Sequence, residues 1–148
     1  MKLRYDGKLV ILTCFYEMRA YSPYVQSLVR TIGVLDKLGI AWDYWPSHGT
    51  YYVEQAVNAS LTKAMNDPSV TDVLTIDSDE SWRAEDVVRL IMHSEEVVGG
   101  SYRKKHMWDE YIANLVPSDG GNPVGKMLPD GTALLKAEGM AGGFYVVD

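Results

Sequence analysis

The sequence predicts an α/β fold in which a mostly parallel β-sheet lies between layers of helices. Strand-like and helix-like segments alternate over the first hundred residues, at the spacing of β-α-β units. The segments 9–12 and 73–76 lack the alternation of apolar and polar residues that marks a half-exposed strand, which is typical of strands covered on both faces. Because β-α-β crossovers carry helices across the sheet, we expect a three-layer αβα arrangement with the strand at 73–76 in its interior.

The first strand is expected at residues 8–15 and the first helix directly after it. Ser22 and Pro23 are typical of a helix start, and Gly39 is typical of a helix end. The inward face of this helix is expected to carry the apolar residues that recur every three or four positions, namely Val25, Leu28, Val29, Ile32, Leu35 and Leu38.

The remaining elements follow from the same kinds of signal. In chain order we expect a strand at 40–45 ended by Pro46, a helix from 50 to the breaker at 66–68, a strand at 72–76, a helix beginning near Glu85, and strands at 96–100 and 142–147. Residues 101–125 are polar and rich in breakers, which indicates a long loop, and residues 129–131 indicate a hairpin turn.

Length and composition limit the classes of function. The 148 residues are expected to form one domain over 1–148, and the net charge of −6 argues against a nucleic-acid partner bound through a broad basic face. The single cysteine, Cys14, fits a reducing compartment, and we expect a cytoplasmic protein. No apolar run is long enough to predict a membrane span.

One motif organises the chain: Asp77 and Asp79 come directly after the apolar strand at 72–76. In an extended segment their side chains point the same way, about 6–7 Å apart. Two carboxylates so placed suit a divalent cation, and ligands of open α/β sheets bind beyond the carboxyl ends of strands. A polar turn that closes the strand explains the same residues, so both interpretations stay open at this point. Trp82 is expected to pack under the motif and hold it in place.

An ordered series of segments, 23–39, 74–82, 85–87, 97–105 and 142–144, resembles GT-A-fold glycosyltransferase-like proteins, most closely uncharacterised bacterial and phage members. The resemblance covers nearly the whole chain. It implies a Rossmann-like sheet of the GT-A nucleotide-diphospho-sugar transferase type, and a domain that is incomplete at its C-terminus.

The resemblance also implies a site. Asp77 and Asp79 would hold Mn²⁺ or Mg²⁺, and the cation would bridge the diphosphate of a nucleotide-diphospho-sugar donor whose sugar passes to an unknown acceptor. The donor-binding residues implied by position are Thr13, Phe15, Tyr16, Asn58, Asp77, Ser78, Lys104 and Lys105. No residue is assigned as the catalytic base.

A metal-dependent glycosyltransferase is therefore the preferred interpretation, with two alternatives. The first is a non-catalytic nucleotide- or sugar-binding domain, or an inactive remnant. A haloacid-dehalogenase-type phosphatase also uses an Asp-x-Asp nucleophile. That class fits less well, because two β-α units precede the motif, whereas such phosphatases carry it on their first strand.

Overall fold

The computed structural model describes residues 5–15, 18–48, 52–93, 95–101, 103–104, 107–111, 113–115, 125–127, 133–140 and 143–147. The chain divides into two compact units, 1–100 with 142–148 and 101–141. The first unit contains the predicted strand-helix alternation and the Asp77–Asp79 motif. The expectation of one domain over 1–148 stays a prediction.

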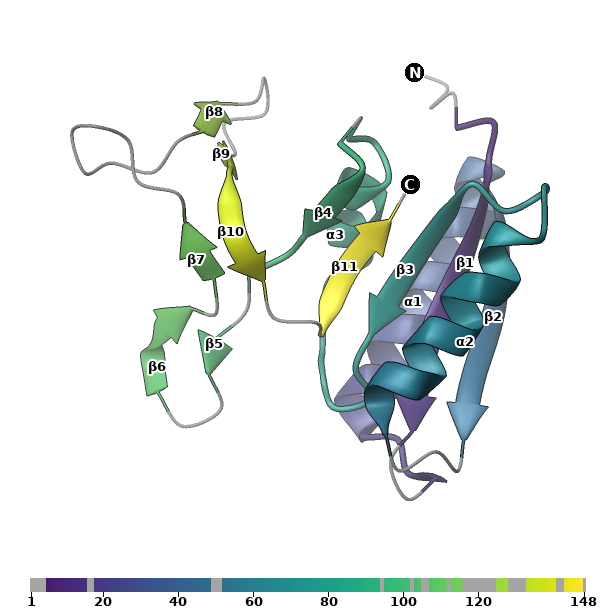
Figure 1. Ribbon diagram of the computed structural model, residues 1–148, viewed down its shortest axis with the longest axis horizontal. Helices are drawn as coiled ribbons and strands as arrows, with labels where there is room; N and C mark the ends of the chain where they lie inside the picture. Colours follow the sequence, from purple (N-terminus) through teal and green to yellow (C-terminus); the bar gives the residue numbers. More distant parts are fainter. Residues whose placement is uncertain are drawn as a thin grey trace. The chain divides into compact units, whose positions relative to one another are not determined.

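The first unit is built on a five-stranded sheet with the order β2-β1-β3-β11-β4 (Figure 1). Its strands are β1 (Lys8–Phe15), β2 (Ala41–His48), β3 (Asp72–Ile76), β4 (Val97–Gly99) and β11 (Phe144–Val147). Strand β1 pairs in parallel with β2 and with β3, and β11 pairs antiparallel with β3 and with β4. The sheet is therefore mixed: four strands share one direction and β11 runs against them.

Helices cover both faces of this sheet, as predicted. They are α1 (Ser22–Leu38), α2 (Val53–Met65) and α3 (Ala84–Leu90). Helix α2 lies in front of β1 and β3 in Figure 1, whereas α1 lies behind the sheet and packs against α3. The α/β class and the interior position of β3 are confirmed.

The core is centred on β1 and β3. All of Leu9–Leu12 and all five residues of β3 are buried. Val10, Leu12 and Val73 pack against Ala64 of α2. Because side chains alternate along a strand, their neighbours in β1 and β3 point to the opposite face of the sheet. Full burial of one such aliphatic side chain is worth about 1.5–3 kcal/mol, so these two strands fix the frame on which the motif sits.

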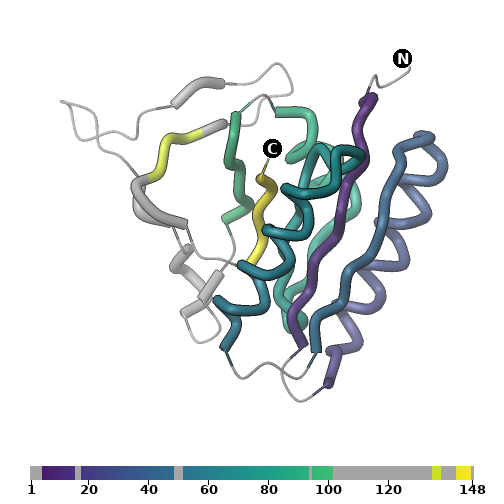
Figure 2. The backbone as a smooth tube through the Cα atoms, turned by 45° about the vertical axis from the view of Figure 1, so that its right-hand side comes forward, coloured from purple at the N-terminus to yellow at the C-terminus, as the bar shows by residue number. Residues whose placement is uncertain are grey.

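The last strand of the chain lies inside the sheet, between β3 and β4, which a local pattern does not predict. Figure 2 shows it as the yellow segment among elements from the first hundred residues. Gly100 allows the close approach: a Cβ there would lie 2.6 Å from the ring of Phe144. Because β11 returns from the second unit rather than through a crossover helix, it enters the sheet in the opposite direction.

The predicted inward face of α1 is wrong in part: Leu35 is buried as expected, but Val25 and Val29 are not. Its buried residues are Tyr24, Ser27, Thr31 and Leu35, whereas Val25 and Val29 are 44% and 63% exposed. The helix is rotated from the expected orientation because Ser27 and Thr31 accept hydrogen bonds from a residue beyond β3. It ends as expected at Gly39, whose φ of 70° is left-handed and whose N–H group bonds back to the last turn.

The predicted end of the second strand is also wrong, because β2 continues through Pro46 to His48. Strand β2 is the edge strand of the sheet, and Pro46 lies opposite Thr13 in the parallel register. A proline is tolerated in an edge strand, where its missing N–H group need not face a neighbouring strand.

The second unit contains short antiparallel pairs where a long loop was predicted. They are β5 (Arg103–Lys104) with β6 (Met107–Tyr111), β7 (Ala113–Leu115) with β10 (Ala137–Met140), and β8 (Gly125–Met127) with β9 (Ala133–Leu135). The β8–β9 pair confirms the hairpin expected around residues 129–131, although the turn itself lies outside the described residues. In the described part of the chain, no helix is both long and apolar enough to cross a membrane.

The packing of β3 gives a first prediction. Leu74→Ala removes a fully buried side chain and should lower the free energy of unfolding by about 2–5 kcal/mol, because a cavity remains. Met65→Ala is the control, since Met65 is 87% exposed and its loss should change stability by less than about 0.5 kcal/mol. Urea unfolding followed by circular dichroism measures both; equal effects would contradict the interior position of β3.

Candidate functional site

The Asp77–Asp79 motif lies at the point where the strand order reverses. Strand β2 lies on one side of β1 and β3 on the other, and the two connecting helices, α1 and α2, lie on opposite faces (Figure 1). The connections therefore diverge beyond the carboxyl ends of β1 and β3. In open α/β sheets this switch point is where ligands bind. Asp77 is the first residue after β3 and so stands at this point.

Cys14 lies near the end of β1, where the charge of Asp77 affects the pKa of its thiol. Burial, and secondarily the Asp77 carboxylate, raise the pKa of the Cys14 thiol above its ordinary value. Both effects disfavour the thiolate, the first because it is desolvated and the second because it meets a like charge. The ends of β1 and β3 thus form one local environment, with its negative charge on the motif.

Backbone hydrogen bonds hold the motif on two sides. The N–H group of Asp77 donates to the carbonyl of Gly143, 2.9 Å away, just before β11. The N–H group of Tyr21, which precedes α1, donates to the carbonyl of Ser78 at 3.3 Å. The N–H group of Glu80 closes a turn on the carbonyl of Asp77 at 3.2 Å. The position of the two aspartates therefore depends on contacts with segments far away in the sequence.

Trp82 fastens the end of the same loop to α1. Its backbone N–H donates to Ser27 Oγ at 3.1 Å, and its indole N–H donates to Thr31 Oγ1 at 2.8 Å. The indole ring also meets the ring of Tyr24 edge-on at 5.4 Å and that of Phe144 at 6.0 Å. These contacts explain why α1 turns Ser27 and Thr31 inward, and they confirm that Trp82 packs beside the motif.

The three acidic residues of the loop differ in exposure. Asp79 is exposed, whereas Asp77 and Glu80 are half-buried. Each of the three takes part in a further interaction within the chain. Among the described residues, no group of three histidine, cysteine, aspartate or glutamate side chains is arranged to hold a metal ion. A cation here would rely on the two aspartates and on oxygens from its ligand and from water, a donor set that suits Mg²⁺.

Thr13 and Phe15, predicted to contact a donor, belong to a chain of packed groups behind the site. Thr13 is fully buried, and its hydroxyl is 2.6 Å from that of Tyr24, which lies 3.2 Å from the hydroxyl of Tyr44. Burial raises the pKa of Tyr24, so its phenol stays protonated. Phe15 is half-buried and stacks on His48 at 5.2 Å, which places aromatic surface at the ends of β1 and β2.

The remaining predicted residues lie elsewhere. Asn58 is exposed on α2, and its backbone carbonyl accepts a hydrogen bond from the Thr62 hydroxyl. Lys104 lies in β5 of the second unit, where its backbone pairs with Met107. Tyr16 and Lys105 lie outside the described residues. The structure therefore brings together Asp77, Ser78 and Asp79 with the end of β1, and it places Lys104 in the second unit.

Sequence reasoning missed the supports of the site. Ser27 and Thr31 are polar residues one helical turn apart on α1, and that spacing was the available signal. Gly143 was predicted only as part of a strand, whereas its carbonyl holds Asp77. Polar side chains on the buried face of a helix indicate a specific hydrogen-bond partner, which here is Trp82.

Comparisons with known proteins support the fold. No protein-family model matches the chain, and no curated protein matches it either. The crystal structure of A197 from STIV is similar, with a TM-score of 0.54 and 14% sequence identity. The match covers 96% of this chain but 64% of A197, so the chain spans less than two thirds of that protein. At this identity the likeness concerns the fold alone.

A second solved structure is more distant. It is 4-diphosphocytidyl-2C-methyl-D-erythritol synthase from Anaerococcus prevotii, with a TM-score of 0.48 and 11% identity, covering 96% of this chain and 70% of that one. At a TM-score below 0.5, this similarity carries no weight for the function of the chain.

The anchoring of Trp82 gives a second prediction. Trp82→Phe keeps an aromatic ring but removes the indole donor from the buried Thr31 hydroxyl, so the free energy of unfolding should fall by about 1–3 kcal/mol. Trp42→Phe is the matched control, because its indole N–H donates to Asp36 in an exposed setting. That variant should lose less than about 0.5 kcal/mol. Equal losses in urea unfolding would contradict the anchoring role.

The coupling between Cys14 and Asp77 gives a third prediction. Asp77→Asn removes the negative charge that disfavours the thiolate, so the pKa of Cys14 should fall. Because Cys14 is the single cysteine, the rate of alkylation by iodoacetamide against pH measures it directly. The midpoint should move to lower pH in Asp77→Asn.

Asp6→Asn is the control for this measurement. Asp6 precedes β1 and is roughly 25 Å from Cys14, from the rise per residue of a strand. Its removal should leave the midpoint unchanged. An unchanged midpoint in Asp77→Asn, or an equal shift in both variants, would contradict the placement of Asp77 beside Cys14.

Proposed function

We propose that this chain is a GT-A-type, glycosyltransferase-like protein that binds a nucleotide-diphospho-sugar through a divalent cation at Asp77 and Asp79. The observation that carries the proposal is the position of these carboxylates directly after β3, at the switch point of the sheet. Of all sites in an open α/β sheet, this is the one where a nucleotide is expected.

The chemistry of the residues fits a cation bound together with a diphosphate. The aspartates offer hard oxygen ligands with negative charge; the charge of Asp77 adds to burial in raising the pKa of Cys14. Alone, that charge repels a diphosphate. Asp77 and Asp79 would hold Mg²⁺ or Mn²⁺, and the cation would supply the positive charge that a diphosphate requires. When bound, the cation also neutralises the charge that gathers on a departing nucleoside diphosphate.

Other described groups fit the remaining parts of a donor. The stacked rings of Phe15 and His48 lie at the carboxyl ends of β1 and β2, and the motif follows the carboxyl end of β3. Such aromatic surface suits a nucleobase. In this proposal Thr13 supports the site from the core through Tyr24 rather than touching the donor.

Transfer to an acceptor is the second part of the proposal. The alternative is a domain that binds the nucleotide-sugar without reacting. Release of free sugar from nucleotide-sugars separates the two: hydrolysis that needs the metal and Asp79 supports an enzyme, whereas metal-dependent binding without turnover supports a binding domain.

The test of the proposal is calorimetry of uridine and guanosine diphosphates with Mn²⁺ and then with a chelator. The parent should bind at least one nucleotide only when metal is present. Asp79→Ala should weaken binding by at least about tenfold, because an anionic ligand of the cation is lost. Asp77→Asn should be milder, since an amide oxygen still accepts a hydrogen bond from a ribose hydroxyl.

Asp6→Ala is the control, because it removes an exposed carboxylate that precedes the amino end of β1, whereas the motif lies beyond the carboxyl ends of the strands. It should bind as the parent does. Asp79→Ala should change the free energy of unfolding by less than about 1 kcal/mol, as expected for an exposed residue. Equal affinity with metal and with chelator would refute the cation bridge, and no binding by the parent would refute the nucleotide site.

A further inference from the structure

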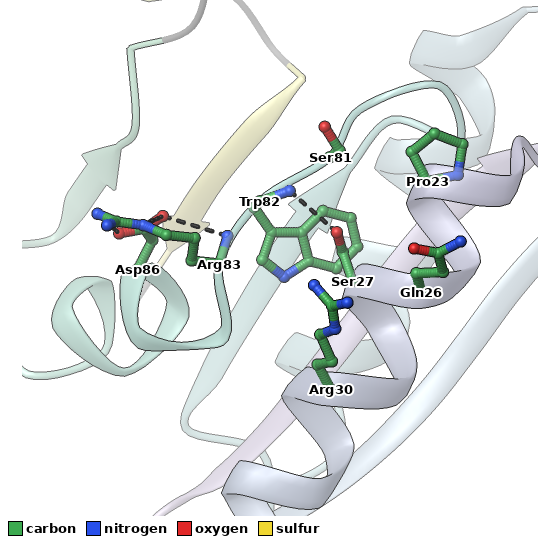
Figure 3. Close-up of a pocket in the computed structure, with 8 residues that line it drawn as sticks. All are labelled: Pro23, Gln26, Ser27, Arg30, Ser81, Trp82, Arg83 and Asp86. Atoms are coloured by element: carbon green, nitrogen blue, oxygen red, sulfur yellow. Dashed lines mark hydrogen bonds and ion pairs between the residues drawn. The ribbon is translucent and has the colours of Figure 1, made fainter.

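A pocket of about 420 Å³ lies between α1 and the segment that leads into α3 (Figure 3). Helix α1 contributes Pro23, Gln26, Ser27 and Arg30, which recur at the spacing of one helix face. The opposite wall comes from residues 81–83 and from Asp86 of α3. All of these residues belong to the first unit, and none is among the donor-binding or metal residues of the nucleotide-sugar site.

The floor of the pocket is rigid. The backbone and the indole of Trp82 are each hydrogen-bonded to α1, and the rings of Tyr24 and Phe144 pack against the indole. Side chains held in this way lose little entropy when a ligand binds. The Trp82 side of the pocket is therefore pre-formed, as is usual for sites that bind small molecules.

The charges of the pocket leave one cation in excess. Arg83 lies 3.2 Å from Asp86, and Arg89, outside the pocket, lies 3.6 Å from the same carboxylate. Asp86 is thus neutralised by two guanidinium groups. Over the part of the chain that the structure describes, Arg30 has neither an ion pair nor a hydrogen-bond partner. A guanidinium so placed binds an anion through two parallel hydrogen bonds.

The other walls define the rest of the ligand. The indole of Trp82 and the ring of Pro23 provide apolar surface against which the C–H face of a ring packs. Gln26, Ser27 and Ser81 provide amide and hydroxyl groups suited to ligand hydroxyls. Because Asp86 is already paired with Arg83 and Arg89, Arg30 is the cation left for a ligand, and a carboxylate matches its single positive charge.

We propose that this pocket binds a small hydroxylated carboxylate of the sugar-acid class, with its carboxylate on Arg30 and its ring against Trp82. The proposal goes beyond the nucleotide-sugar site and does not depend on it. It can therefore be tested with a chelator present and without any nucleotide.

The experiment is a titration of the ¹⁵N-labelled parent with D-glucuronate, followed through the indole N–H signals, of which that of Trp82 is assigned from its loss in Trp82→Phe. The Trp82 signal should shift and saturate. Glucose, which has the ring without the charge, and acetate, which has the charge without the ring, should each bind at least about tenfold more weakly.

The key variant is Arg30→Gln, which keeps a polar side chain but removes the charge. It should weaken glucuronate binding by at least about tenfold, and Arg30→Lys should restore part of the loss. Lys37→Gln is the matched control, because it removes one exposed positive charge from the last turn of the same helix. It should bind as the parent does, and thermal unfolding should be alike for all three variants.

Several results would overturn the proposal. One is a parent whose Trp82 signal does not respond to glucuronate. Another is glucose or glucose 6-phosphate binding as tightly as glucuronate, which would show that the carboxylate is not what the pocket selects. Arg30→Gln binding like the parent, or Lys37→Gln weakened as much as Arg30→Gln, would show that Arg30 is not the anion partner.

Discussion

The structure depends on the attachment of the loop after β3 to helix α1. Trp82 makes this attachment through two hydrogen bonds to buried hydroxyl groups, at 3.1 Å to Ser27 and 2.8 Å to Thr31. A buried hydroxyl without a partner costs about 1–3 kcal/mol, so the helix cannot rotate away without leaving these groups unsatisfied. The same contact that orients α1 therefore also fixes the loop that carries Asp77 and Asp79.

The loop at residues 77–82 contributes to both candidate sites, and it is held at both of its ends. At its start, the N–H group of Asp77 is bonded to Gly143, and the carbonyl of Ser78 is bonded to Tyr21. At its end, Trp82 forms the floor of the pocket that Arg30 borders. The first turns of α1 thus support the aspartates on one side and provide the wall of the pocket on the other. Rigid support of this kind keeps functional groups in place in the absence of a ligand.

The sequence predicted those parts of the molecule that follow from local burial. Strand β3 was placed at its observed residues because its sequence lacks the apolar–polar alternation of a half-exposed strand, and all five of its positions are buried. The face of α1 was misassigned because hydrophobic periodicity favours Val25 and Val29, whereas the observed face is set by the hydrogen bonds of Ser27 and Thr31. The place of β11 and the extension of β2 through Pro46 depend on which strands become neighbours, and a local pattern does not contain that information. Of the predicted donor-binding residues, the structure brings together those beside β1 and β3 and assigns Lys104 to the other unit.

The acidity of the chain constrains how either site attracts an anion. With a net charge of −6, long-range attraction of anionic ligands is not available. Salt screens distant charges beyond about 8 Å at physiological ionic strength, so capture depends on groups within the site itself. The aspartate motif meets this requirement only with a bound cation, because its own charge is negative. The pocket meets it with Arg30, since Asp86 is already paired with Arg83 and Arg89. The two sites therefore differ in kind: removal of divalent metal should abolish anion binding at the first and leave the second unchanged.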